Sequence, residues 1–469
     1  MKKQKRTCRA YWLILLLAAA VYAVMALSDN IWADEAYTFA MLRHSFGEIW
    51  TITAADVHPP LYYFAAKLLT MPFGYSQYAV RLFSGICYFV ILAVGGAELG
   101  RLFGKKTGLI FMVLFLLYPF SLDHAVQARM YPLAAASVFL CALFAYRAWL
   151  ENRIWDWVGF AAGGLCAAYS HYFALVAAGV IYGLLFLCCL VRKRGLLKPW
   201  LAAAAATVVL YCPWLTCFLG QLAYKVNNEY WISPITLKTL MNDLLSLLHA
   251  NGAGTFPLFF GLLGLGLIAL LLRRKATVPL LALAVPLLTF VLGVGVSMVI
   301  RPIFIIRYLV PCAPLIIFFV AYGLSLIRRE AVFGGAMALL LTAFSSNLFF
   351  AMEDILPDPD KFGSAAVEQA SRAEAYVVLT NNHFHVSQVA AYYQDTAPIY
   401  TPETLGAASP YTNVHLLPEF SPEAYSCFAV LTPAGSEPES ALCEGFQATK
   451  LGTYYAAYTT FDLWLLERS

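Results

Sequence analysis

Two neighbouring carboxylates, Asp34 and Glu35, follow the first long apolar segment of the chain directly. A carboxylate that is partly shielded by aromatic neighbours such as Trp32 and Tyr37 can accept a proton, which suits a general base at a membrane interface. The structural alternative is that Asp34 caps a short helix while Glu35 stays solvated. Both interpretations place the pair at the start of a helix that must be held near the membrane surface.

Histidines provide a second set of candidate groups. His58 precedes Pro59 and Pro60 in the same stretch of chain, and His124, His171 and His249 fall in other predicted loops. An imidazole there can contact a phosphate, hold a metal ion or make interfacial hydrogen bonds. The spacings HxxxH and HExxH, typical of zinc sites, do not occur. A divalent metal ion held by His58 and His171 is therefore an open alternative, and no other cofactor is indicated.

The composition is that of a membrane protein. Of 469 residues, 61% are hydrophobic and only 12% are charged, whereas a soluble domain carries about 25% charge. The net charge of +4 is spread over short clusters between apolar stretches, so no nucleic-acid partner is indicated. The first apolar stretch is longer than that of a typical signal peptide and no clear cleavage site follows it, so we expect an uncleaved helix.

About eleven apolar stretches are long enough to cross roughly 30 Å of hydrocarbon as helices. They lie near 11–27, 77–99, 107–122, 131–149, 155–170, 172–190, 199–218, 257–272, 277–300, 304–327 and 331–350. Basic clusters fall on one side of all these spans, which predicts a cytoplasmic N-terminus in a multi-pass protein of the cell membrane. The candidate site residues fall on the other side.

The first outer loop, 28–76, is longer than a connector needs, and long loops with helical patterning are usually functional. A short amphipathic helix is predicted over 35–44, capped by Asp34, and another over 61–71, begun by two prolines. Both would lie along the membrane surface. A later segment near 235–249 is also amphipathic, and it is either a lid over the site or a surface connector.

The chain changes character after residue 351, where Pro, Ser, Asp and Glu become frequent. Strands are predicted over 375–380, 428–432 and 461–466, with a helix over 386–393. We therefore expect an all-α membrane domain over 1–351 and a small extracytoplasmic α/β domain over 352–469. Cys427 and Cys443 lie in that second domain, where a disulfide between them is plausible.

Several motifs, taken together, carry a family resemblance. They are the pair Asp34-Glu35, the string DVHPPLYY at 56–63, Arg81, Pro119, the triplet Arg129-Met130-Tyr131, the pair Arg307-Tyr308 and Pro311. In these residues the chain resembles the bacterial members of the dolichyl-phosphate-mannose protein mannosyltransferase family. That family belongs to the GT-C superfamily, which also contains the aminoarabinose transferases that act on lipid A. The similarity covers roughly residues 1–350.

The resemblance implies a polyprenyl-phosphate-linked sugar as donor, with its tail lying between helices. Asp34 is then the expected base. It deprotonates an acceptor hydroxyl, which attacks the anomeric carbon with inversion, and the lipid phosphate leaves. Glu35 is the second member of the catalytic pair, and Asp123 matches a second acidic residue that helps to orient the acceptor. Asp123 is otherwise a polar helix end.

Phosphate as a leaving group calls for cations, and Arg is suited to bidentate phosphate contact. Arg307 is the first candidate, followed by Arg129 and Arg301, with Tyr308 beside the first. Lys67, on the second loop helix, either faces the lipid phosphate or extends toward the interface. Snorkelling at a helix end is the structural alternative for Arg307.

Three other functions compete with this interpretation: a transporter or flippase for lipid-linked sugars, a polymerase or ligase with a diphosphate-linked donor, and a membrane sensor. A transporter needs charged or broken helices at the bilayer midplane, and none is predicted. The sugar and the acceptor, which is a protein, lipid or glycan, are not fixed by the sequence, because loops and the C-terminal domain select them.

Overall fold

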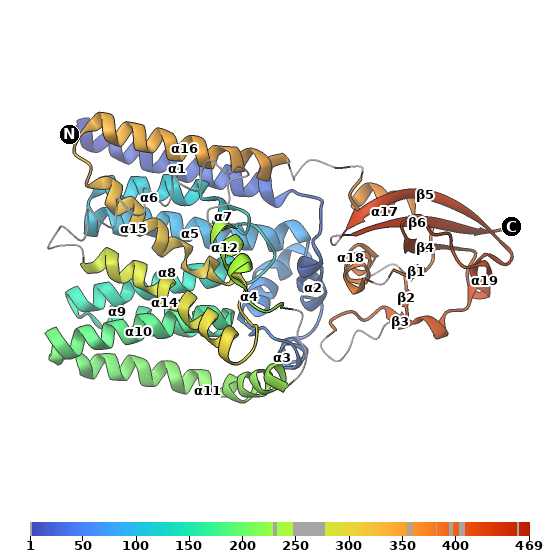
Figure 1. The fold of residues 1–469 in the computed structure, drawn as a ribbon, viewed down its shortest axis with the longest axis horizontal. Helices are drawn as coiled ribbons and strands as arrows, with labels where there is room; N and C mark the ends of the chain where they lie inside the picture. The colour runs from blue at the N-terminus through green and yellow to red at the C-terminus, as the bar shows by residue number, and fades with distance from the viewer. Residues whose placement is uncertain are drawn as a thin grey trace. The chain divides into compact units, whose positions relative to one another are not determined.

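The computed structural model of the chain is shown in Figure 1. It describes residues 2–227, 232–246, 277–353, 358, 360–380, 382–393, 397–402, 409–456 and 459–469. The predicted span at 257–272 and His249 lie outside these residues. The chain divides into two compact units. The first, here called the bundle unit, comprises Met1–Ala26, Val57–Ala65 and Arg81–Ala351. The second, the sheet unit, comprises Leu27–Asp56, Ala66–Val80 and Met352–Ser469.

Helices make up the bundle unit. They are α1 (Lys2–Ala26), α5 (Gln77–Phe103), α6 (Lys105–Leu117), α7 (Pro119–Leu122), α8 (Tyr131–Glu151), α9 (Ile154–Ser170), α10 (Tyr172–Arg192), η2 (Arg194–Leu196), α11 (Leu197–Asn227), α12 (Leu237–Ser246), α14 (Thr277–Val299), η3 (Ile306–Cys312), α15 (Ala313–Ser325) and α16 (Glu330–Glu353). Within the described residues, every predicted apolar stretch is helical. Seven of these segments are long and apolar enough to cross a membrane by themselves, so the full count of about eleven crossings stays a prediction.

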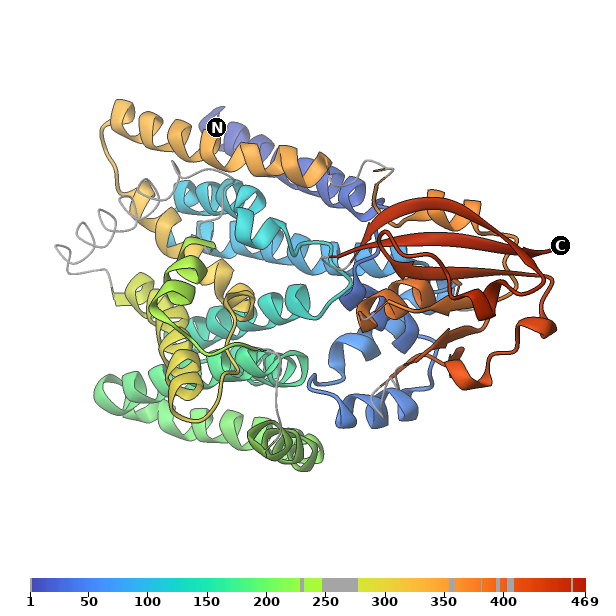
Figure 2. The same cartoon turned by 45° about the vertical axis from the view of Figure 1, so that its right-hand side comes forward.

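The backbone conformations of two residues explain where α8 and α9 end. In α8 the left-handed conformation of Asn152 (φ 49°) closes the C-terminus. Between α9 and α10, His171 is extended, and its Nδ1 accepts a hydrogen bond from the backbone N–H of Phe173 at 3.1 Å. One histidine thus ends one helix and caps the next, which forms the hairpin expected there. Figures 1 and 2 show α8, α9, α10 and α11 side by side.

Close packing between α8 and α9 depends on a glycine. A Cβ built on Gly163 would lie 2.8 Å from the backbone nitrogen of Cys141, which is too short for real atoms. The two helices can therefore approach only because position 163 has no side chain.

Two predicted spans are less regular than expected. The stretch 107–122 breaks at Tyr118 because Pro119 cannot continue a helix. The stretch 304–327 begins with the 3₁₀ helix η3, which contains Pro311, and only α15 is α-helical. Arg307 therefore lies on η3 and not on an α-helix, which corrects the sequence-based expectation.

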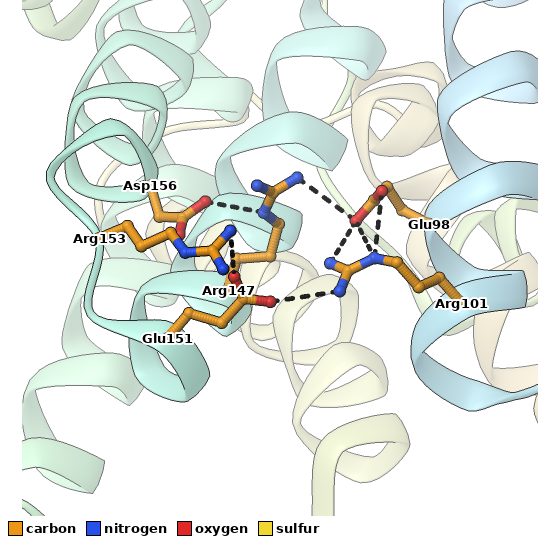
Figure 3. A network of polar contacts seen from close by, with 6 residues as sticks. All are labelled: Glu98, Arg101, Arg147, Glu151, Arg153 and Asp156. Carbon is orange, nitrogen blue, oxygen red and sulfur yellow. Dashed lines mark hydrogen bonds and ion pairs between the residues drawn. The ribbon is translucent and has the colours of Figure 1, made fainter.

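One end of the bundle is tied together by an ion-pair network, shown in Figure 3. Its members are Glu98, Arg101, Arg147, Glu151, Arg153 and Asp156, from α5, α8 and the start of α9. The buried carboxylate of Asp156 is 2.7 Å from Nε of Arg147, whose Nη1 is 3.4 Å from Glu98. These three residues join three helices, so Glu98 has a structural role.

The sheet unit contains one six-stranded sheet in the order β3-β2-β1-β4-β6-β5. The strands are β1 (Tyr376–Val378), β2 (Ile399–Thr401), β3 (Val414–Leu416), β4 (Cys427–Pro433), β5 (Phe446–Ala456) and β6 (Thr459–Arg468). Strands β3, β2, β1 and β4 pair in parallel, whereas β6 is antiparallel to both of its neighbours. The short helices of this region are α17 (Ser364–Gln369), α18 (His383–Tyr393), η4 (Leu417–Glu419), η5 (Pro422–Ala424) and α19 (Ser440–Cys443).

The small C-terminal sheet is present, with the predicted strands at β1, β4 and β6 and the predicted helix at α18. Two sets of buried apolar residues, one containing Val378 and Leu431 and the other Val377 and Val430, form the core. No disulfide forms within this core: Cys427 is a buried free thiol and Cys443 is also free.

The first outer loop also contributes to the sheet unit. Its helices are α2 (Ala33–Met41), α3 (Phe46–Ala55), α4 (Leu61–Thr70) and η1 (Met71–Phe73). Helices α2 and α4 match the two predicted ones. Helix α3 was not predicted, although Ser45 and Glu48 form a capping box in which each side chain bonds to the other's backbone N–H, at 3.3 and 2.8 Å.

Candidate functional site

A cavity of about 430 Å³ lies in the bundle unit among residues from α10, α11, α14 and the segment around η3. Four of the predicted site residues line it: His58, His171, Arg301 and Tyr308. They come from three distant parts of the chain, since Arg301 and Tyr308 are only seven residues apart, and the fold brings them to one cavity. The imidazoles of His58 and His171, in either tautomer, and the hydroxyl of Tyr308 can each donate a hydrogen bond to an anion. Arg301 adds a positive charge.

The remaining wall of the cavity is almost entirely apolar. Leu222, Leu292 and Ile300 line it and are respectively 44%, 50% and 60% exposed, so the cavity reaches the outer surface of the bundle. In a membrane that surface faces lipid. A ligand with a charged head and a long hydrocarbon tail fits such a lining, because the head can contact the polar side chains while the tail packs against the apolar wall.

His171 is the centre of the polar end. Its ring centroid lies 5.0 Å from that of Tyr308, 5.5 Å from that of Tyr131 and 6.4 Å from that of His58. Because Nδ1 accepts the bond from Phe173, the neutral ring carries its hydrogen on Nε2. The hydrogen bond that caps α10 thus fixes the tautomer of His171, and its Nε2–H is the group that donates.

The DVHPPLYY string is fixed to the bundle through its two tyrosines. Both side chains are fully buried. The hydroxyls of Tyr62 and Ser84 are 2.8 Å apart, and Nη1 of the buried Arg129 donates to the hydroxyl of Tyr63 at 3.4 Å. Arg129 does not line the cavity; it anchors the start of α4, which follows His58.

The segment between α7 and α8 carries an acid and an imidazole with different surroundings. The side chain of Asp123 is exposed. The Nδ1–H of His124 donates to the carbonyl oxygen of Phe120 at 3.1 Å. Burial, together with the positive charge of Arg307, lowers the pKa of His124 to about 4, although the bond to Phe120 acts in the opposite direction. His124 is therefore a neutral imidazole at physiological pH, next to a cation.

Asp34 and Glu35 differ in role within the sheet unit. The N-cap of α2 is Trp32, so Asp34 lies in the first turn and does not cap the helix as predicted. Glu35, which is 4% exposed, instead contacts the N-cap residue: its carboxylate accepts a hydrogen bond from the backbone N–H of Trp32 at 3.3 Å. Glu35 thus stabilises the helix start, and Asp34, partly exposed, is the carboxylate of the pair better suited to chemistry.

The contacts of Lys67 are with other parts of the sheet unit. Its ammonium is buried and donates to the carbonyl oxygen of Leu42 at 2.7 Å and to the hydroxyl of Tyr75 at 3.2 Å. It also lies 4.6 Å from the centroid of the Tyr75 ring. These contacts join α4 to the end of α2 and do not favour the predicted role in phosphate binding.

Helix α18 holds the segment that leads into α2. The hydroxyl of Tyr392 donates to the carbonyl oxygen of Asp29 at 2.8 Å and accepts from the N–H of Ile31 at 3.3 Å. Nε2 of Gln388 donates to the carbonyl oxygen of Ile31 at 2.9 Å. Two side chains of the C-terminal region therefore fix the backbone just before Asp34.

Sequence reasoning missed two cavity residues, Tyr172 and Gln221. The hydroxyl of Tyr172 donates to Oε1 of Gln221 and accepts from Nε1 of Trp214 at 3.2 Å. They sit within long apolar helices, where one polar residue gives no motif. Among the described residues no group of three or more His, Cys, Asp or Glu side chains could hold a metal ion. The His58–His171 metal site thus lacks a third ligand of these types in the described part of the chain.

The comparisons with known proteins agree with this architecture. Residues 57–216 match the family model described as Dolichyl-phosphate-mannose-protein mannosyltransferase. No curated protein matches the chain. Among solved structures, ArnT from Cupriavidus metallidurans in the apo state has a TM-score of 0.70 at 12% identity and covers 98% of each chain.

Two further structures share the fold. ArnT from Cupriavidus metallidurans bound to undecaprenyl phosphate has a TM-score of 0.66 at 12% identity, with 97% of each chain covered. The arabinofuranosyltransferase AftD from Mycobacteria has a TM-score of 0.50 at 13% identity and covers 97% of this chain and 40% of that chain. The chain therefore shares the fold of these solved transferases, and its seven long apolar helices indicate a multi-pass membrane protein. The resemblance to the mannosyltransferase family, predicted from the motifs over roughly 1–350, is confirmed for residues 57–216.

Proposed function

We propose that the protein is a glycosyltransferase that moves a sugar from a polyprenyl-phosphate donor to a hydroxyl group of an extracytoplasmic acceptor. The observation that carries this proposal is the cavity, which combines His58, His171, Arg301 and Tyr308 with an apolar wall that reaches the lipid-facing surface. The dolichyl-phosphate-mannose named in the matched family and the undecaprenyl phosphate in one ArnT structure support the same donor class.

In the proposed reaction Asp34 takes the proton of the acceptor hydroxyl. The oxygen then attacks the anomeric carbon and forms the new glycosidic bond with inversion. The bond between that carbon and the phosphate oxygen breaks, and its electron pair leaves with the lipid phosphate. Arg301 and Arg307 stabilise the phosphate charge, and Nε2–H of His171 supplies a neutral donor. Asp123, being exposed, is assigned to orientation of the acceptor.

The proposal places the N-terminus in the cytoplasm and the sheet unit outside. The basic clusters that end α5, α10 and α15 then face the cytoplasm, as the positive-inside rule requires. A polyprenyl-phosphate donor would be used at the outer leaflet.

The deciding experiment incubates the purified full-length protein with a panel of polyprenyl-phosphate sugars and measures release of the lipid phosphate. At least one donor should turn over. Asp34→Asn should lower the rate by about 10²–10⁴-fold, the range typical of a lost general base, with unchanged thermal unfolding. Asp360→Asn, an exposed carboxylate of the sheet unit, serves as the matched control.

Folded protein that turns over none of the donors would contradict the proposed reaction. Turnover that survives in Asp34→Asn would instead retain the glycosyltransferase and remove Asp34 as its base.

A further inference from the structure

A second cavity, of about 250 Å³, lies in the bundle unit between α5, α8, α10, α14 and α15. Most of its lining is apolar, including Phe103, Leu185 and Phe318. Leu150 lines it and is 45% exposed, so this cavity also reaches the lipid-facing surface. It shares no lining residue with the cavity of the proposed reaction.

The mouth of this cavity carries the cationic side chain of Arg192. Arg192, in the last turn of α10, lines it and is exposed. Among the residues that the structure describes, its guanidinium makes no hydrogen bond or ion pair. The next residue, Lys193, has internal partners. Its ammonium donates a hydrogen bond to the carbonyl oxygen of Trp149 at 2.6 Å and lies 4.7 Å from the centroid of the Trp149 ring.

The nearby ion-pair network does not compete for an anion. It joins three arginines to three carboxylates, as Figure 3 shows, and is therefore neutral as a whole. Arg101 and Arg147, which come from two of the five helices that border the cavity, are both paired within the network. Among the described residues that line this cavity, Arg192 is therefore the cation without a paired carboxylate.

We propose that this cavity binds one acyl chain of an anionic glycerophospholipid whose phosphate pairs with Arg192. A bilayer is as apolar as the cavity, so burial of the chain alone gives little preference for one lipid over another. Selection must come from the headgroup, and basic pockets between membrane helices are known to bind anionic headgroups. Trp149 at the same mouth is typical of the membrane interface.

The test reconstitutes the full-length protein in vesicles of equal parts dioleoyl-phosphatidylglycerol and dioleoyl-phosphatidylcholine. The protein is then extracted in mild detergent, and the retained lipids are quantified by mass spectrometry. Retained lipid should favour phosphatidylglycerol by about fivefold, the value of one arginine near a headgroup.

Arg192→Gln should abolish this preference. The matched control is Arg329→Gln, because Arg329 is exposed and does not line the cavity. Ala282→Phe, which fills the cavity from α14, should reduce the amount of either lipid retained. Its control is Val291→Phe, on the lipid-facing side of the same helix, where Val291 is 61% exposed.

Equal retention of the two lipids by the unchanged protein would overturn the proposal. So would an equal loss of preference in the two arginine variants, since that would indicate general surface charge. Thermal unfolding of each variant separates these results from misfolding, and none of them depends on glycosyl transfer.

Discussion

The imidazole of His171 shows how one side chain can serve both fold and site. Its Nδ1 caps α10, and the same bond leaves hydrogen on Nε2 inside the cavity. The sequence predicted His171 at a tight turn on the functional side, but not its place among Tyr131, Tyr308 and His58. That place depends on four separate chain segments, and no spacing rule encodes it.

The Asp34–Glu35 pair shows the limit of motif reasoning at this scale. Both carboxylates were predicted, with the capping role given to Asp34. The structure gives the helix-start contact to Glu35, because the helix begins at Ala33 and the third helical residue reaches back to Trp32. A shift of the boundary by two residues exchanges the roles, and sequence patterns do not fix helix boundaries that finely.

His124 leads to a prediction about acid stability. Burial and Arg307 lower its pKa to about 4, whereas an unfolded histidine titrates near about 6.5. The unfolded chain thus binds the proton more tightly, and stability is lost as pH falls from 6.5 toward 4. Through His124, lowering the pH from 7 to 5 should reduce the free energy of unfolding by roughly 2 kcal/mol.

Thermal unfolding at pH 7 and pH 5 tests this prediction. His124→Asn keeps an N–H donor for Phe120 and should show a smaller loss at pH 5 than the unchanged protein. His415→Asn removes an imidazole whose side chain is 41% exposed and should change the pH dependence little. Equal losses in all three proteins would contradict the assignment.

At the scale of elements, the link between α18 and the segment before α2 makes the C-terminal region part of the proposed site. Tyr392→Phe removes two hydrogen bonds to that backbone. If Asp34 is the base, a looser start of α2 should lower kcat by about tenfold and leave KM for the lipid donor nearly unchanged, since Tyr392 does not line the donor cavity.

Steady-state kinetics of the variant measure this split. Tyr455→Phe, at an exposed position of β5, is the control and should keep the kcat of the unchanged protein. An increase in KM without a change in kcat would show that Tyr392 acts on donor binding and not on the base.

Elements with strong local signals were predicted well, and those without them were missed. The long apolar helices and the buried strands β1, β4 and β6 follow from hydrophobic pattern alone. Strands β1, β2 and β3 are three residues each. Only β1 lies in a longer apolar run, 375–380, so β2 and β3 gave no comparable signal. In β5 the residues from 447 to 450 are exposed, so it forms through pairing with β6 and not through burial.

At the scale of the molecule, the orientation in the membrane is the prediction with the widest consequence. An epitope tag placed after Ser469 should be accessible from outside intact cells. A tag inserted at Gly195, between α10 and α11, should become accessible only after permeabilisation. The opposite pattern would reverse the bundle and place the donor cavity at the inner leaflet.

The sheet unit is assembled from three separate stretches of chain, two of which, Leu27–Asp56 and Ala66–Val80, lie in the N-terminal part of the sequence. The last residues of the protein are therefore not a module that can be cut off at residue 352 and exchanged with that of a relative. A working graft would have to carry Leu27–Asp56 with it, because α18 and the approach to α2 hold each other by hydrogen bonds. Any evolutionary change that reshapes the C-terminal region must then preserve these contacts with a loop that lies 357 to 363 residues earlier in the sequence.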